Sequence, residues 1–182
     1  MNTQQPDLAL AAVCGLYCPA CSVYIAVQED RKAALERMAA TMHIKPEDLR
    51  CEGCRSGTKG VFCKDCQFKS CAETKGLNFC SECEEYPCNA LKEFQQKMPH
   101  RAELWASLDR IREVGWETWF AESRERHSCP SCGHTNGWYE LQCSRCGQEP
   151  GSPFTAENPG IAAFLKSRDR KSTRLNSSHG KL

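Results

Sequence analysis

Apolar residues recur at three- and four-residue spacing along two stretches of the chain, which is typical of amphipathic helices. The first stretch predicts a helix over residues 22–42, with charged residues on the side opposite the apolar stripe. The apolar positions of this helix are Leu35, Met38, Ala39 and Met42. Since helical apolar spacing reports burial far more often than a cofactor-binding face, we expect this stripe to lie in the core.

The second helical stretch follows Cys88 and extends to about His127, with breaks predicted near Pro99 and Gly115. Its apolar face carries Leu104, Leu108 and Ile111 and continues through Trp116, Trp119 and Phe120. We expect these aromatic rings to pack the two helical regions together. The alternative is an exposed aromatic surface that binds a protein partner.

Cysteine and glycine dominate the segment between the two helical regions. From Cys51 to Cys88 the longest interval without a cysteine is eight residues, and four glycines interrupt the segment. We therefore expect little regular structure there. Because such a segment cannot build an ordinary hydrophobic core, its stability would have to come from bound metal.

Fifteen of the 182 residues are cysteine, and most of them fall in close pairs or triplets. Paired Cys-x2-Cys spacing suits tetrahedral metal coordination better than disulfides, because two thiolates on one tight turn can point at a common ion. The first residues show no secretory signal, and no apolar run approaches the length of a membrane span. We therefore expect a cytoplasmic, metal-loaded protein without a membrane segment.

The formal net charge is only +1, which gives no general electrostatic attraction to nucleic acid. Basic residues near the cysteines are better interpreted as charge balance for thiolates, since a closed four-cysteine zinc site carries a net charge of about −2. Between Cys129 and Cys146 the one basic residue is Arg145. Nucleic acid is therefore not expected as a partner.

The last residues, 169–182, are treated apart from the fold. Residues 169–179 resemble the in-frame translation of a widely used sequencing adapter, and the alternative is a genuine polar, disordered tail. The segment 169–182 holds four basic residues and one acidic residue, so without it the net charge would be −2 rather than +1. The native C-terminus is left open.

The clearest ligand set lies in the C-terminal part, where Cys129-Pro-Ser-Cys132-Gly is followed by Cys143-Ser-Arg-Cys146-Gly. Glycine after the second cysteine of each pair accepts the left-handed backbone that lets amides bend back toward sulfur. Two such turns facing each other form a zinc ribbon. We predict this ribbon over residues 128–150, with all four thiolates bound to one zinc ion.

The segment between these two cysteine pairs is expected to form a short β-hairpin, which Trp138, Tyr139 and Leu141 suit. His134 lies next to the predicted site, but four thiolates complete the shell, so we interpret it as a solvated loop residue. The hairpin makes the predicted fold class α+β: a small, metal-stabilised protein in which a cysteine-rich irregular module packs with two helical regions. The predicted domains are a cysteine-rich metal-binding domain (10–98), a helical connector (99–127) and the zinc ribbon (128–150).

Cys14, Cys18 and Cys21 form a second ligand set with Cys-x3-Cys-x2-Cys spacing. This spacing equals that of the radical S-adenosylmethionine cluster motif, in which three thiolates leave one iron of a 4Fe-4S cluster open. The rest of the chain lacks the alternating strand and helix pattern of a barrel and is short for one. We therefore favour a metal site that is completed by Cys88, which would join the two helical regions.

Seven more cysteines form a third set whose pairing the sequence leaves open. They are Cys51, Cys54, Cys63, Cys66, Cys71, Cys80 and Cys83. In one partition the first four close a compact site and the last three bind metal with water or a histidine. In the other, the first two pair with the last two. Three thiols left over would be buried spectators, an open catalytic zinc site, or a site completed by His43 or His100.

Cysteine motifs within residues 14–92 carry a resemblance to a known family. In order, the motifs are Cys14-Gly-Leu-Tyr-Cys18 with Cys21 and Tyr24, Cys51-Glu-Gly-Cys54, Cys71-Ala, Cys80-Ser-Glu-Cys83 and Glu85-Tyr-Pro-Cys88. In order and spacing they resemble the cysteine-rich bacterial and archaeal family called domain of unknown function 3795 (DUF3795). The resemblance implies metal binding, and a helix like residues 114–127 leading into a zinc ribbon like residues 129–147. It implies no reaction.

Two functions of different classes follow, and the sequence leaves open whether the protein is an enzyme. The first is a zinc-stabilised interaction or regulatory module, since the chain contains no P-loop, dinucleotide-binding glycine pattern, Gly-x-Ser-x-Gly or His-Glu-x-x-His motif. The second is an iron-sulfur or thiol-redox enzyme that uses Cys14, Cys18 and Cys21 or the unpaired thiols. Zinc is the expected cofactor, with an iron-sulfur cluster as the alternative at the N-terminal cysteines.

Overall fold

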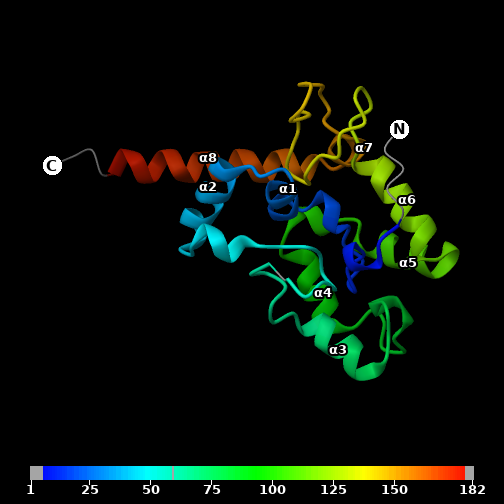
Figure 1. Ribbon diagram of the computed structural model, residues 1–182. Helices are drawn as coiled ribbons and strands as arrows, with labels where there is room; N and C mark the ends of the chain where they lie inside the picture. The colour runs from blue at the N-terminus through cyan, green and yellow to red at the C-terminus, as the bar shows by residue number, and fades with distance from the viewer. Residues whose placement is uncertain (1–5, 59, 179–182) are drawn as a thin grey trace.

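The computed structural model describes residues 6–58 and 60–178, whose regular structure is helical (Figure 1). In chain order the α-helices are α1 (Ser22–Gln28), α2 (Lys32–Met42), α3 (Gln67–Lys75), α4 (Asn89–Gln96), α5 (Leu104–Val114), α6 (Trp116–His127), α7 (Pro153–Glu157) and α8 (Pro159–Ser178). Short 3-10 turns lie at Leu8–Leu10, Cys18–Ala20, Pro46–Leu49, Cys80–Glu82 and Pro99–Arg101. No helix in the described part of the chain is long and apolar enough to cross a membrane.

The expected α+β fold with a β-hairpin was wrong. Within residues 6–58 and 60–178 there is no sheet, and strand pairing is limited to two isolated bridges. The backbone of the predicted hairpin makes other hydrogen bonds: the amide of Trp138 donates to the carbonyl of Ala20 at 3.0 Å, and the amide of Gly137 donates to the Glu140 carboxylate at 2.7 Å. Since these donors are already used, they cannot form the ladder of a hairpin.

The predicted helix over residues 22–42 is two helices, α1 and α2, separated by a turn. Asp30 has a left-handed backbone with φ of 49°, and the amide of Arg31 reaches back to the carbonyl of Ala26 at 2.9 Å. The guanidinium of Arg31 then hydrogen-bonds to Glu140, far along the chain. A contact at such sequence separation carries no periodic signal, which is why the pattern predicted one continuous helix.

The apolar stripe of α2 lies in a core, as predicted. Ala39 is buried, and it shares a small cluster with Val23 and Leu49. Leu35 and Met38 pack against this cluster from α2. The cluster also contains a cysteine of the irregular segment, so it seats α1 and α2 on the cysteine-rich part of the chain.

Helix α3 corrects the expectation of little regular structure between the helical regions. It ends at Gly76, whose φ of 66° supplies the left-handed backbone of a helix C-cap. Phe68 and Ala72 are buried on its inner face, and the ring of Phe68 meets the ring of Phe94 edge-on at 4.9 Å. The cysteines on either side of this helix hid its short apolar face from the sequence pattern.

The second helical region is confirmed, with breaks at the predicted places between α4, α5 and α6. Leu104, Leu108 and Ile111 are all buried on α5. Trp119 and Phe120 of α6 are buried as well, and both rings meet Tyr17 edge-on, at 6.3 and 5.0 Å. These aromatics therefore pack α6 against the loop that contains Tyr17 and are buried in the core, and their expected packing against the 22–42 region stays a prediction.

Helices α7 and α8 follow the last cysteines. The hydroxyl of Ser152 accepts a hydrogen bond from the amide of Thr155 and caps α7. Phe154 and Ile161 are buried in the main core, and Figure 1 shows the last turns of α8 projecting beyond the other helices. The backbone is helical through Ser178, and the adapter origin of residues 169–182 stays a prediction, with residues 179–182 outside the described part.

Candidate metal centre

Two cysteine-containing turns repeat one backbone geometry. In the first turn, the amide of Cys129 donates to the carbonyl of His134 at 2.8 Å, and the amide of Gly133 donates to the carbonyl of Cys129 at 2.9 Å. The same two hydrogen bonds recur in the second turn, at 2.8 and 2.9 Å, from Cys143 to Gln148 and from Gly147 to Cys143. The glycines have φ of 70° and 75°, as their left-handed role predicted.

The two turns bring four sulfur atoms together. Those of Cys129, Cys132, Cys143 and Cys146 all lie within 4.8 Å of one another, and none is in a disulfide. The Cys129 and Cys146 sulfurs are 3.6 Å apart, and the Cys132 and Cys143 sulfurs are 3.7 Å apart. Four sulfurs bound tetrahedrally at about 2.3 Å from one zinc ion would be about 3.8 Å apart. The predicted cysteine cluster is confirmed, and its spacing fits a single metal ion.

Hydrogen bonds to sulfur shift the pKa values of Cys143 and Cys146 in opposite directions. The amide of Ser131 donates to the Cys129 sulfur at 3.4 Å. Burial raises the pKa of Cys143, but hydrogen bonds from the amides of Cys146 and Arg145 outweigh it and lower the pKa to about 6. Since metals bind the thiolate form, Cys143 is the thiol that is ready to bind metal at neutral pH, whereas hydrogen bonds with the other three sulfurs raise the pKa of Cys146 to about 12.

His134 is not the solvated loop residue that we expected. Its side chain is buried, and Nε2 lies 3.0 Å from the hydroxyl oxygen of Ser144 in the second turn. Burial lowers the pKa of His134, so the ring is held as a neutral hydrogen-bonding group. It therefore connects the two turns from outside the ring of sulfurs, a role that the complete cysteine set did not suggest.

Asn136 is a supporting residue that sequence reasoning missed. It is fully buried, and its amide nitrogen donates to the carbonyl of Gly151 at 2.6 Å. Its side-chain oxygen accepts a hydrogen bond from the amide of Ser144 at 3.2 Å. An asparagine in a short polar segment gives no local signal of burial, so these contacts could be found only from the folded chain.

The eleven cysteines of the N-terminal part form a larger and more buried group. Burial raises the pKa of Cys14 and Cys18 well above the ordinary value, and the nearby Cys54 thiol raises both further. Cys63 and Cys80 are partly buried, and burial raises their pKa values to about 12. A cluster with these properties stays protonated at neutral pH unless a cation compensates the thiolates.

Charge interactions show which of these thiols are neighbours. One connected group of thiols contains Cys18, Cys21, Cys51, Cys54 and Cys63, and Cys66 interacts with Cys54 and Cys63 of this group. A second group has Cys80 at its centre, surrounded by Cys66, Cys71, Cys83 and Cys88, and Cys14 interacts with members of both groups. In the described residues no three of these eleven sulfurs lie as close together as the C-terminal four. The ligand partition, including the site that joins Cys14, Cys18, Cys21 and Cys88, stays a prediction.

Some groups around these thiols favour a thiolate. Cys21 precedes α1, and the backbone amides of Tyr24 and Val23 act on its sulfur to lower the pKa. The Cys54 sulfur accepts a hydrogen bond from the amide of Val13, and the positive charge of Arg55 acts on it as well. Burial still outweighs these contributions, so the pKa of each thiol is raised. A bound cation would complete the compensation that the protein begins.

The N-terminal and C-terminal cysteine regions meet along a polar and aromatic seam. The guanidinium of Arg31 donates to the carboxylate of Glu140 at 3.0 Å and to the hydroxyl of Ser144 at 3.0 Å. The ring of His100 stacks on Trp138 at 4.4 Å, and its Nδ1 lies 2.6 Å from the Tyr139 hydroxyl. The seam therefore holds the second cysteine turn and the segment before it against the turn between α1 and α2 and against the Pro99–Arg101 turn.

Comparison with known protein families gives a match that covers the N-terminal cysteines. Residues 10–93, hereafter the DUF3795 region, match the family described as a protein of unknown function, DUF3795. The DUF3795 match agrees with the resemblance carried by the cysteine motifs and spans just under half of the chain. The four-cysteine site at residues 129–146 lies outside it. No curated protein and no solved structure matches the chain.

Proposed function

We propose that the protein binds one zinc ion through Cys129, Cys132, Cys143 and Cys146 and that this ion has a structural role. The sulfur spacing of 3.6 and 3.7 Å carries the proposal, because it is close to the separation that a tetrahedral four-thiolate zinc site requires. Four protein ligands leave no open position for a substrate. Zinc therefore supports an interaction or regulatory module rather than a catalytic centre.

The ion would fix a surface for a protein partner. The second cysteine of each turn, Cys132 or Cys146, is exposed, as are Pro130, Ser131 and Arg145 between the ligands. Elsewhere in the described chain, Phe62 is the most exposed large apolar side chain, at 66%, and it precedes a DUF3795-region cysteine. Exposed turns held by metal and an exposed aromatic ring both support binding to a macromolecule.

Metal quantification of anaerobically purified protein, together with its absorption spectrum, tests the zinc proposal. The Cys129→Ser, Cys143→Ser double variant should contain one zinc ion fewer per chain than the unsubstituted protein. Ser131→Ala is the matched control, because it changes an exposed side chain in the same turn and keeps the amide that donates to sulfur. Equal zinc content in the double variant and the control would refute the assignment.

An iron-sulfur cluster in the DUF3795 region is the second candidate, and the looser spacing of its sulfurs favours it. Each cysteine of a 4Fe-4S cluster binds a different iron, so its cysteine sulfurs lie farther apart than those around a single ion. The raised pKa values of Cys14, Cys18 and Cys54 argue against the thiol-redox alternative, which needs an accessible thiolate. Iron and acid-labile sulfide in the same preparation, with visible absorption, would support the cluster, and a colourless protein that contains zinc alone would exclude it.

A further inference from the structure

Arg55 lies where three cysteine-bearing segments of the DUF3795 region meet. Its Nε donates to the carbonyl of Ala11 at 2.9 Å, and its Nη2 donates to the carbonyl of Asn78. The guanidinium also lies over the ring of Phe79, 4.9 Å from the ring centroid. One side chain therefore joins segments that are distant in the sequence. Each segment has a cysteine within three residues of these contacts: Cys14, Cys54 and Cys80.

The three segments pack against one another around Arg55. The amide of Cys80 donates to the carbonyl of Val13 at 2.9 Å, so the first and third segments are paired directly. Cys14 and Cys54 are buried in one core cluster, and Cys80 packs against it. The acidic groups that interact with the charge of Arg55 are mostly thiols, and in order of strength they are Cys54, Glu82, Cys18 and Cys14.

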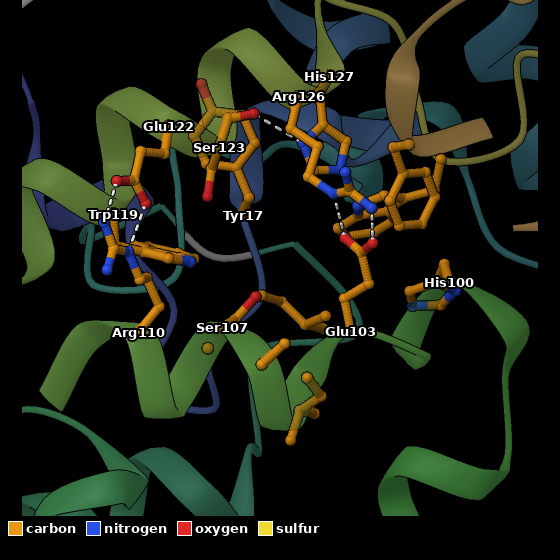
Figure 2. Close-up of a pocket in the computed structure, with 16 residues that line it drawn as sticks. Tyr17, His100, Glu103, Ser107, Arg110, Trp119, Glu122, Ser123, Arg126 and His127 are labelled. Carbon is orange, nitrogen blue, oxygen red and sulfur yellow. Dashed lines mark hydrogen bonds and ion pairs between the residues drawn. The ribbon is translucent and has the colours of Figure 1, made fainter. Parts of the chain in front are cut away.

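No carboxylate within residues 6–58 and 60–178 forms an ion pair with Arg55. Glu82 interacts with it at longer range, and the carboxylate of Glu82 accepts a hydrogen bond from the amide of Asn78 at 2.8 Å. Other half-buried arginines differ: Arg110 and Arg126 each bind a glutamate, as the dashed lines in Figure 2 show. Since a charge removed from water is costly unless it is paired, Arg55 requires ionised thiols beside it.

Arg101 repeats this arrangement from a different part of the chain. Its guanidinium lies over the ring of Phe94, 3.5 Å from the centroid, and donates to the carbonyl of Phe94 at 2.7 Å. Its Nε is buried, and among the described residues it has no hydrogen-bond partner and the guanidinium no carboxylate partner. The acidic groups that interact with its charge are Cys14 and Tyr139. Two arginines therefore place positive charge near one buried thiol, that of Cys14.

We propose that Arg55 and Arg101 are the counter-charges of an iron-sulfur cluster that has Cys14 among its ligands, and that they raise its reduction potential. The inference rests on the cluster proposed above for the DUF3795 region. One-electron reduction makes a thiolate-bound cluster more negative, so a neighbouring positive charge stabilises the reduced form more than the oxidised form. The two arginines act through their charge and bind neither iron nor sulfide.

Redox titration of the full-length, anaerobically purified protein with dithionite tests the proposal, because visible absorption reports the reduced fraction of the cluster. In Arg55→Gln and in Arg101→Gln the ratio of reduced to oxidised cluster at a fixed potential should fall about tenfold, which is about 59 mV for a one-electron couple. Arg55→Lys and Arg101→Lys keep the charge and should restore most of this ratio. If the arginines served packing alone, the lysine variants would be changed as much as the glutamine variants.

Arg168→Gln is the matched control, because Arg168 is exposed outside the DUF3795 region and its guanidinium also lies over a phenylalanine ring, 5.8 Å from the centroid. It should leave the potential unchanged. If a glutamine variant loses the cluster, iron content becomes the measurement, and the matching lysine variant should keep its iron. An unsubstituted protein without iron and acid-labile sulfide would refute the cluster and this proposal together. A cluster whose potential is the same in both glutamine variants would overturn the role of the arginines alone.

Discussion

The two cysteine regions of this protein place their sulfurs in different ways. The C-terminal four come from two turns that each close on their own backbone, so each Cys-x2-Cys pair is formed by its local sequence. The eleven of the DUF3795 region come from loops, from α3 and from residues just before helices, and only the folded chain brings them near one another. Ligand geometry is thus encoded locally in one region and by tertiary packing in the other.

The regions also differ in how easily their thiols ionise. In the C-terminal site hydrogen bonds lower the pKa of Cys143 to about 6 and raise that of Cys146 to about 12, so one thiol ionises ahead of the other, whereas burial raises the pKa of Cys14, Cys18 and Cys54 alike. We therefore expect the C-terminal site to take up metal after the chain has folded. In the DUF3795 region, metal binding must accompany the burial of the thiols, so metal content and folding are coupled there.

The largest expected effect is on zinc affinity, and it should distinguish the two cysteine regions. Cys143→Ser should weaken zinc binding at the C-terminal site by more than the roughly 100-fold that loss of an outer-shell contact costs, because a ligand itself is removed. Competition with a chromophoric chelator measures the change. Cys14→Ser is the companion variant, and it should destabilise the DUF3795 region and leave zinc affinity at the C-terminal site unchanged. A fall in that affinity in both variants would show that the regions bind metal as one unit.

Two buried glycines offer a sharper comparison, since an added methyl group meets backbone at each. In Gly151→Ala the new Cβ would lie 2.6 Å from the carbonyl oxygen of Glu140, beside the second cysteine turn. In Gly53→Ala it would lie 2.5 Å from the carbonyl oxygen of Ala9, and the φ of 117° adds strain. We expect each substitution to cost about 1–3 kcal/mol in the free energy of unfolding, with the larger cost at Gly53.

Thermal or denaturant unfolding of these glycine variants checks the costs, and metal content assigns each effect to a region. Gly57→Ala is the control, because Gly57 is exposed and no atom lies within 4 Å of the added Cβ. It should change stability by less than about 0.5 kcal/mol. If Gly151→Ala removed metal from the DUF3795 region, the separation of the two regions would be wrong.

The features that the sequence predicted correctly are those encoded locally. The ring of four sulfurs and the left-handed glycines of its turns were predictable, because Cys-x2-Cys-Gly specifies one local geometry. The buried face of α5 and the aromatics of α6 were predictable from helical periodicity. These features depend on residues within a few positions of one another.

The failures depend on contacts between distant residues. The hairpin was wrong because the amide of Trp138 bonds to Ala20, and the single N-terminal helix was wrong because the chain turns at Asp30. The buried positions of His134 and Asn136 likewise result from packing between turns. Spacing in the sequence could not supply the ligand partition of the eleven N-terminal cysteines, since Cys14, Cys63 and Cys80 each have three or more thiol neighbours in the fold.

His100 allows the seam between the two regions to be tested by pH. Burial, with a smaller contribution from Arg101, lowers the pKa of His100 to about 4. Below about pH 6.5, the histidine pKa of the unfolded state, the unfolded state binds more protons than the folded state. The stability contributed by the neutral His100 ring is therefore complete above about pH 6.5 and is lost as the pH falls toward 4. His100→Phe keeps the stacking on Trp138 and removes the titrating group. When the pH is lowered from 7.5 to 5.5, its free energy of unfolding should fall by about 1.4 kcal/mol less than that of the unsubstituted protein.

Urea unfolding of both proteins at the two pH values measures this difference, and effects common to both, such as protonation of thiolates, cancel in the comparison. The Tyr139 hydroxyl, 2.6 Å from Nδ1, is the other titratable partner of the ring, and its pKa is raised by burial, so it stays neutral across this range. An identical pH dependence in the two proteins would show that His100 is not buried at the seam.

The smallest expected effect concerns the ion pair of the same seam, Arg31 with Glu140. The two side chains are about one quarter exposed, at 28% and 26%, and solvent screening reduces the pair to about 0.5–1 kcal/mol in a double-mutant cycle with Arg31→Met and Glu140→Gln. Arg31 also pairs with Glu29, so the cycle with Glu29→Gln separates a local contact from one that spans the regions. If the Arg31–Glu140 coupling is also found when zinc affinity of the C-terminal site is measured, the seam links metal binding at that site to the packing of the N-terminal region. If it appears in stability alone, the seam only holds them together, and the local encoding of the C-terminal site is sufficient for its metal.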